Sequence, residues 1–224
     1  MNLDTLVPAV IVVAIMLLIG FPVHEFAHAL AAFRLGDGTA KWFGRLTLDP
    51  RVHFDRIGGS LLALTFLSSA AIPGGSAFGF GWAKPTPVNP MNLAFGRRGE
   101  AIVAAAGPLS NLVLAAAAAI PLRYMIANPE LISDLTLLFD VLWFFVLINV
   151  LLMVFNLIPI PPLDGSKVLF AFLDRRTEHQ IRPMLEQYGL FILIALLWFP
   201  PGDSIGFRVI GPIIDGIFDL LVGL

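Results

Sequence analysis

Two histidines and a glutamate with H-E-x-x-H spacing lie in a long apolar stretch near the start of the chain. They are His24, Glu25 and His28. Residues four apart share one face of a helix, so both imidazoles can reach one metal ion. Glu25 then lies beside that ion, where a general base for water would be. Between Leu6 and Phe33 these are the only strongly polar side chains, and ionisable groups in so apolar a segment are costly enough to indicate function.

A third ligand has to come from elsewhere, because a catalytic metal site needs three protein ligands and one open position. The chain has no cysteine, so histidines and carboxylates are the available donors. Asp164 follows the proline-rich segment 159–163 and precedes Gly165. Prolines keep this segment extended, and extended backbone near membrane depth is tolerated only where it is buried or lines a wet cavity. Asp164 is therefore a candidate ligand, and a role as helix N-cap is compatible with ligation.

The composition places these residues in a membrane protein. The 224 residues are 58% hydrophobic and 13% charged, whereas roughly 25% of an average soluble domain is charged. The mean hydropathy is +0.86, and several apolar stretches reach the ~20 residues that cross a bilayer. The net charge of −2 gives no indication of nucleic-acid binding. We therefore expect an all-α polytopic membrane protein that is embedded in the lipid bilayer.

Breaks between the apolar stretches predict the individual elements. We expect about five to six membrane segments, with a core over about residues 6–175 and C-terminal segments over about 188–224. The alternation from Trp42 to Leu48 predicts a short strand near the membrane surface. Residues 57–80 are interrupted by Pro73–Ser76 and fit either a re-entrant hairpin or a full crossing. The predicted helices cover 6–35, 99–123 and 135–157, with a short helix from 166 and further apolar segments at 188–199 and 206–224.

The distribution of basic residues favours the re-entrant hairpin over the full crossing. Lys and Arg are enriched in cytoplasmic loops of membrane proteins. With a hairpin at 57–80, the loops 34–56, 81–98 and 166–186 share one side of the membrane. These loops hold twelve of the fourteen basic residues, namely Arg34, Lys41, Arg45, Arg51, Arg56, Lys84, Arg97, Arg98, Lys167, Arg175, Arg176 and Arg182. A full crossing would divide them between both sides. We therefore expect the H-E-x-x-H helix to end toward the cytoplasm.

Three stretches of the chain together resemble one known family. They are F-P-V-H-E-F-A-H-A at 21–29, G-P-L-S-N at 107–111 and F-N-L-I-P-I-P-P-L-D-G at 155–165. The chain resembles the site-2 protease family of intramembrane zinc metalloproteases. The segment 57–80 and the loop G-W-A-K-P-T-P-V-N-P at 81–90 resemble a compact prokaryotic subgroup. For this subgroup we expect no PDZ-like insertion and no C-terminal CBS module. The resemblance implies a single membrane-embedded metalloprotease domain over residues 1–224, in the prokaryotic plasma membrane with the active site toward the cytoplasmic side.

The resemblance also implies a role for each motif residue. His24, His28 and Asp164 would hold one zinc ion per chain, and Glu25 would be the catalytic base. Asn156 would hold the substrate or stabilise the oxyanion, and the G-P-L-S-N helix would pack as a core element. The activity implied is zinc-dependent cleavage of transmembrane segments of membrane proteins. Regulation would come from the membrane core, from another membrane protein or from a homo-oligomer.

Other interpretations of these residues stay open at the level of sequence. A metal or proton transporter or channel could use the same His, Glu and Asp side chains, although the chain shows no internal repeat. An inactive scaffold is a third possibility, which the intact Glu25 disfavours. Asn156 could cap its helix, and Asn111 is expected to make a helix–helix hydrogen bond. We expect His53 to order its loop and Lys84 to lie at the membrane interface rather than contact substrate.

Overall fold

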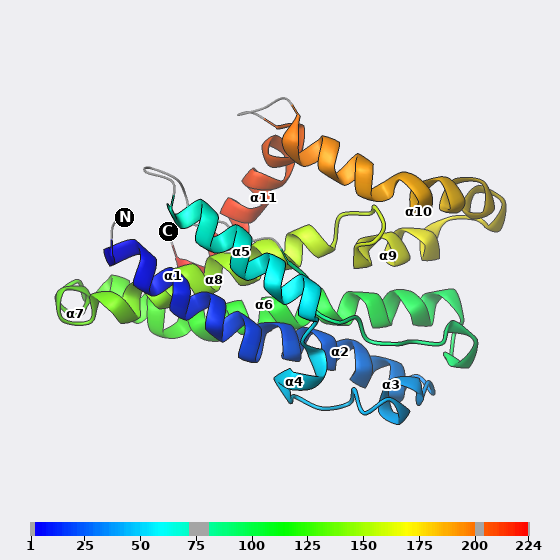
Figure 1. Cartoon of the computed structure of the whole chain (residues 1–224), viewed down its shortest axis with the longest axis horizontal. Helices are drawn as coiled ribbons and strands as arrows, with labels where there is room; N and C mark the ends of the chain where they lie inside the picture. The colour runs from blue at the N-terminus through cyan, green and yellow to red at the C-terminus, as the bar shows by residue number, and fades with distance from the viewer. Residues whose placement is uncertain (1–2, 72–80, 200–203, 224) are drawn as a thin grey trace.

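The computed structural model describes residues 3–71, 81–199 and 204–223, which are helical with irregular connections and contain no strand (Figure 1). The helices are α1 (Leu3–Ile15), α2 (Phe21–Arg34), α3 (Thr39–Trp42), α4 (Pro50–His53), α5 (Arg56–Ala71), α6 (Arg97–Ala127), α7 (Glu130–Asp134), α8 (Thr136–Asn156), α9 (Asp164–Phe172), α10 (Arg175–Trp198) and α11 (Ile205–Val222). A π-helical turn at Met16–Gly20 joins α1 to α2, and a 3₁₀ turn at Pro90–Asn92 precedes α6.

Three helical stretches of the described residues are long and apolar enough to cross a membrane. They are Leu6–Arg34, which includes α1 and α2, Arg97–Ala127 and Thr136–Asn156. The chain is therefore an integral membrane protein, and its three predicted central helices are present. The larger predicted count of about five to six segments is not confirmed. The reasons are that α5 has only 16 residues and that α11 carries Arg208, Asp215 and Asp219 among its 18.

The first long helix is irregular just before the H-E-x-x-H motif. Pro22 occupies the first turn of α2, directly after the π-helical turn. Proline lacks an amide hydrogen and usually disturbs the helix that contains it. Here the disturbance is a wider turn, in which the amide of Phe21 donates to the carbonyl of Met16. Such π-turns occur frequently at functional sites.

Helix α6 is the element around which the others are arranged. It packs against α2, α8 and α9, and more lightly against α11. Its buried surface includes small residues such as Gly107, Ala115 and Ala119. Small side chains allow close approach between helices where lipid supplies no hydrophobic driving force. The expected role of the G-P-L-S-N helix as a core element is confirmed, because Gly107, Pro108 and Asn111 are all buried.

The predicted strand from Trp42 to Leu48 is wrong. Trp42 ends α3, and turns and bends follow it. Gly44 has a φ of +68°, which lies outside the extended region that a strand requires. Arg45 is 6% exposed and donates to the carbonyl of Val52. The alternating sequence therefore forms a compact loop that is held by an inward-facing guanidinium group.

Helix α5 leaves this loop, and the chain later returns to the point of departure. The helix begins at Arg56, and the described chain resumes at Gly81 after residues 72–80, which lie outside the described part. Gly58 lies directly against the carbonyl of Trp82, and a Cβ atom at Gly58 would overlap it. The amide of Lys84 donates to the carbonyl of His53 over 2.8 Å. The two ends of the excursion are therefore neighbours, as in a hairpin.

The loops that are rich in basic residues meet at one end of the molecule. The amide of Ala94 donates to the carbonyl of Leu35 over 2.7 Å, which joins the start of α6 to the end of α2. Arg97 donates to the carbonyl of Leu173 over 3.0 Å, which joins the same end of α6 to the end of α9. The segments 34–56, 81–98 and 173–178 are therefore held together by direct hydrogen bonds.

The C-terminal part differs from the expected boundaries. A single helix, α10, joins the polar residues 175–187 to the predicted apolar segment 188–199. The next helix, α11, passes through Gly211 and Pro212 without a break and covers most of the predicted segment 206–224. A Cβ atom at Gly211 would meet nothing within 4 Å. Figure 1 shows α10 above the long helices, where α11 joins it to the bundle.

The carboxylate of Glu178 on α10 stabilises the end of the molecule where the loops rich in basic residues meet, which we call the basic end. Glu178 is 7% exposed and pairs with Arg97 of α6 and, over 3.1 Å, with Arg182 of its own helix. Burial raises the pKa of Glu178, but hydrogen bonds from the two guanidinium groups outweigh burial and hold the pKa below the ordinary 4.5. The charged carboxylate therefore stabilises the folded state above pH 4.5, and this contribution is lost as the pH falls through the lower folded-state pKa.

We expect Glu178→Gln to lower the free energy of unfolding at neutral pH by about 1–3 kcal/mol, since it removes charge-assisted hydrogen bonds from a buried acceptor. Thermal unfolding in detergent measures the effect. The difference from the wild-type protein should shrink as the pH falls below 4.5. The matched control is Glu186→Gln, because the exposed pair with Arg182 should contribute less than about 1 kcal/mol. Equal losses in both variants would contradict the assignment.

Candidate metal centre

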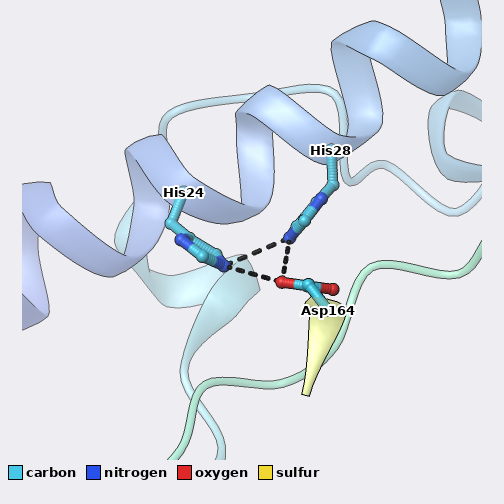
Figure 2. A group of neighbouring side chains, drawn as sticks. All are labelled: His24, His28 and Asp164. Atoms are coloured by element: carbon cyan, nitrogen blue, oxygen red, sulfur yellow. Dashed lines mark hydrogen bonds and ion pairs between the residues drawn. The ribbon is translucent and has the colours of Figure 1, made fainter. Parts of the chain in front are cut away.

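The two histidines of the motif point from one side of α2 toward the start of α9 (Figure 2). His24 and His28 are 8% and 7% exposed. The Nδ1 atom of His24 lies 2.6 Å from Oδ1 of Asn111, and that of His28 lies 2.7 Å from the carbonyl of Val103. Both partners are oxygen acceptors on α6, so each Nδ1 carries the proton and each Nε2 presents its lone pair. This is the tautomer that a metal-ligating histidine needs.

Asp164 reaches the histidines because α9 begins there. The segment before it is a series of turns that includes the cis peptide bond between Pro161 and Pro162. Gly165 packs so tightly against the carbonyls of Leu157 and Ile158 that a Cβ atom would overlap them. The Asp-Gly pair therefore lets the new helix start against the end of α8. The carboxylate comes to lie at the imidazoles, with Asp164 9% exposed.

The three side chains form a triangle of ligand atoms. Nε2 of His24 and Nε2 of His28 are 3.1 Å apart, and Oδ2 of Asp164 lies 3.5 Å and 3.1 Å from them. A tetrahedral zinc ion with ligands at about 2.0–2.1 Å separates its ligand atoms by about 3.3 Å. The triangle therefore matches one face of a zinc coordination tetrahedron. The fourth vertex is left for water or substrate, as in catalytic sites.

Gly107 provides the space that an ion at this triangle needs. A Cβ atom at this position would overlap Nε2 of His28 and would lie 2.6 Å from Nε2 of His24. The glycine of the G-P-L-S-N segment thus faces the ligand atoms across the α2–α6 contact. Because glycine has no side chain, the backbone of α6 can approach the metal site closely without filling it.

Two asparagines form the outer shell on the opposite side of His24. Nδ2 of Asn111 donates to Oδ1 of Asn149 over 3.3 Å, and Nδ2 of Asn149 donates to the carbonyl of Phe145 over 2.8 Å. Asn111 is 1% exposed and Asn149 is fully buried. This relay fixes the amide of Asn111 so that its oxygen faces His24. The helix–helix hydrogen bond expected of Asn111 is present, and its partner Asn149 is visible only in the structure, because one polar residue in an apolar helix does not reveal its partner.

Glu25 lies next to the ligands and is held by a loop. The residue is 9% exposed. Its Oε2 atom accepts from the amide of Thr86 over 2.8 Å and from the hydroxyl of Thr86 over 2.7 Å. Thr86 belongs to the Pro/Asn-rich loop that precedes α6. The sequence analysis did not identify Thr86, since 61 residues separate it from Glu25.

The second carboxylate oxygen of Asp164, Oδ1, also has a partner. Nζ of Lys167, one turn further along α9, lies 3.4 Å from Oδ1 of Asp164. The positive charge of Lys167 favours the charged form of the Asp164 carboxylate. The carboxylate is therefore ionised, which is the form that binds a cation.

The remaining candidates lie apart from the triangle in the described structure. Nδ2 of Asn156 donates to the carbonyl of Leu152 over 2.9 Å, within its own helix. His53 bonds to the carbonyl of Thr47 over 2.8 Å and orders the loop, as expected. Lys84 has an exposed side chain and contributes its amide to the loop. Among the described residues, the cluster of possible metal ligands is His24, His28 and Asp164.

The fold and the site together define a zinc metalloprotease centre of the H-E-x-x-H type that is built between membrane helices. Comparison with known sequences agrees with this class. The profile of peptidase family M50 matches residues 124–200, a range that includes Asp164. A Bacillus subtilis (strain 168) protein named "Putative zinc metalloprotease YwhC" is 33% identical over 208 residues, which cover 92% of this chain and 89% of that protein.

A second relative extends the comparison to mycobacteria. A Mycobacterium tuberculosis (strain ATCC 25618 / H37Rv) protein named "Putative zinc metalloprotease Rip2" is 31% identical over 199 residues, which cover 86% of this chain and 69% of that protein. No solved structure matches the chain. The chain belongs to peptidase family M50, the site-2 protease family, and the donor set of His24, His28 and Asp164 fits one zinc ion.

We expect Gly107→Ala to reduce the zinc content of the purified protein from one ion per chain to a small fraction, because the added methyl group would enter the space between the ligand nitrogens. Elemental analysis of detergent-purified protein measures this. The matched control is Gly216→Ala on α11, where a Cβ atom meets nothing within 4 Å. Full zinc content in Gly107→Ala would show that the ion does not bind at this triangle.

Proposed function

We propose that the protein is an intramembrane endopeptidase that cleaves transmembrane segments of other membrane proteins. The observation that carries the proposal is the position of His24, Glu25 and His28 within the apolar stretch Leu6–Arg34, with Asp164 beside the two histidines. A hydrolytic centre inside a membrane helix gives access to peptide bonds that water-soluble proteases do not reach. Membership of the site-2 protease family supports the same substrate class and disfavours a transporter.

In the proposed mechanism each residue of the site has one task. His24, His28 and Asp164 would hold the zinc ion, which would supply activation of a water molecule and polarisation of the scissile carbonyl. Glu25 accepts the proton of the attacking water and passes it to the leaving amine. Asn111 and Val103 keep the imidazoles in the ligating tautomer. Because the four residues are buried, bulk water has restricted access to the site.

Asn156 is proposed as the group that stabilises the oxyanion or holds the substrate. It ends α8, eight residues before Asp164. In the described structure its amide nitrogen donates one hydrogen to the carbonyl of Leu152 within α8, which fixes the amide group. The second hydrogen of the same nitrogen can donate to a peptide oxygen. Preorganised donors of this kind often contribute a large share of transition-state stabilisation.

A transmembrane substrate has to unwind before it can be cut, because a helix hides its carbonyls in hydrogen bonds. We propose that the irregular residues 81–89, of which Thr86 bonds to Glu25, accept the unwound segment by strand addition. The segment 40–48 is a compact loop and is not available for such pairing.

The basic end of the molecule is proposed to face the cytoplasm of a prokaryotic cell. His28 lies six residues before Arg34 at this end of α2, which is about 9 Å along a helix. The return of the chain from Trp82 to Gly58 supports the re-entrant alternative for 57–80. Twelve of the fourteen basic residues are then on the side that the charge rule assigns to the cytoplasm.

Glu25→Gln tests the catalytic proposal. The amide keeps the shape of the side chain but cannot accept a proton, so we expect full zinc content and a loss of at least about 100-fold in cleavage of a transmembrane-segment reporter. Zinc analysis and gel-based cleavage in detergent measure the two effects. The control is Glu130→Gln, a change at the exposed start of α7. Cleavage by Glu25→Gln at the wild-type rate would refute the mechanism, and absence of zinc from well-folded wild-type protein would refute the metal site.

The proposed orientation is tested with single cysteines, since the chain has none. Met91→Cys lies at the basic end and Ser133→Cys lies on α7, and both positions are exposed. In intact bacterial cells, we expect a membrane-impermeant maleimide to label Ser133→Cys and to leave Met91→Cys unlabelled until the cells are opened. The reverse pattern would place the basic end outside the cell and would leave the zinc site unaffected.

A further inference from the structure

Residues 81–89, which we call the strap, lie along α2 and are attached to the molecule at three points. The amide of Lys84 donates to the carbonyl of His53 over 2.8 Å. Thr86 bonds to Glu25. The amide of Asn89 donates to Oδ2 of Asp37 over 2.7 Å. The middle attachment, at Thr86, is the one that contacts the proposed catalytic base.

The contact between Thr86 and Glu25 is concentrated on one carboxylate oxygen. The amide and the hydroxyl of Thr86 both donate to Oε2, over 2.8 Å and 2.7 Å. The hydroxyl also lies 3.1 Å from the backbone carbonyl of Glu25. Among the described residues, no group donates to the other oxygen of Glu25, Oε1. This oxygen is therefore available to accept a proton. Two charge-assisted bonds to one oxygen fix the torsion of the carboxylate as well as its position.

The far attachment of the strap keeps Thr86 in place. Asp37 is fully buried and accepts from the amide and hydroxyl of Thr39, from the amide of Asn89 and from Nδ2 of Asn92. Burial raises the pKa of Asp37, but these hydrogen bonds outweigh burial and lower the pKa. The anchor is therefore ionised at neutral pH, and it joins the end of α2 to the strap on the same side as Glu25.

We propose that Thr86 is a positioning residue that orients Glu25 for proton transfer, an inference that rests on the proposed proteolytic function. Its hydroxyl and amide hold Oε2 and leave Oε1 to meet the attacking water. A general base acts only within hydrogen-bond reach of the proton it takes, and a misplacement of about 1 Å can cost 100-fold in rate. Because the strap is also the proposed docking edge, an unwound substrate would bind directly beside the residue that aligns the base.

Two substitutions separate the hydroxyl of Thr86 from its shape. Thr86→Val keeps the size and the amide but removes the hydroxyl, whereas Thr86→Ser keeps the hydroxyl. The matched control is Thr136→Val at the opposite end of α8 from Asn156, where the hydroxyl bonds to carbonyl groups of the preceding helix, α7. All variants are made in the full chain and purified in detergent with zinc.

Three measurements are made on each variant: zinc per chain, kcat and KM on a transmembrane-segment reporter, and affinity for acetohydroxamate. The last is followed by the visible absorption of cobalt-substituted protein and needs no cleavable substrate. A hydroxamic acid gives up its proton when it binds a metal, and Glu25 is the group placed to accept that proton. Its affinity therefore depends on the orientation of Glu25.

We expect Thr86→Val to keep its zinc and its KM while kcat falls about 10–100-fold. Acetohydroxamate affinity should fall about 10-fold for the same reason. Thr86→Ser should restore both values to within about 3-fold of wild type, and Thr136→Val should change neither. If wild-type protein cleaves no reporter, the proposed function fails, and the hydroxamate measurement still decides the role of Thr86.

Wild-type kcat and hydroxamate affinity in Thr86→Val would overturn the proposal. A change in KM alone would make Thr86 a substrate contact instead. If Thr86→Val loses zinc, Thr86→Ala repeats the measurements with a smaller side chain. Loss of zinc in both variants would show that the residue supports folding rather than the orientation of Glu25.

Discussion

The structure depends on the cost of placing ionisable side chains inside an apolar helix. His24, Glu25 and His28 lie where lipid and apolar side chains offer no hydrogen bonds, so each needs a partner from another element. The acceptors for the two Nδ1 atoms are Asn111 and the carbonyl of Val103, both on α6. The contact between α2 and α6 is therefore determined by polar groups as well as by packing.

That contact explains why so many small or unusual residues surround the site. Gly107 lets α6 approach the ligand nitrogens, and Gly165 lets α9 begin against the end of α8. A side chain at Gly107 would enter the space between the ligand nitrogens, and one at Gly165 would overlap the carbonyls of Leu157 and Ile158. In the strap, the hydroxyl and amide of Thr86 donate to the carboxylate of Glu25 without adding a charge. Close backbone approach is therefore what makes a metal centre possible between these helices.

The arrangement also gives the molecule two different ends. Hydrogen bonds join Leu35 to Ala94, His53 to Lys84 and Leu173 to Arg97. These hydrogen bonds hold together the loops that carry most of the positive charge. The chain leaves these loops along α5 and at Gly81 lies beside Gly58 again, so the loops before and after α5 are neighbours. Within the apolar stretch Leu6–Arg34, both histidines lie nearer the end at Arg34 than the start. The proposed orientation in the membrane and the proposed depth of the site therefore rest on one set of contacts.

The sequence by itself determined the chemistry: the H-E-x-x-H face, the third ligand Asp164, the absence of thiolate donors and the three long apolar helices. These follow from residue type and local periodicity, which depend only on near neighbours in the chain. Only the tertiary structure decided that Asn111 and Asn149 support His24, that Gly107 clears space for the ion and that Thr86 holds Glu25. These contacts join residues 38 to 87 positions apart, and no local pattern encodes such pairs. The same reason explains the misplaced strand at 42–48, where alternation was visible but the inward hydrogen bond of Arg45 to Val52 was not.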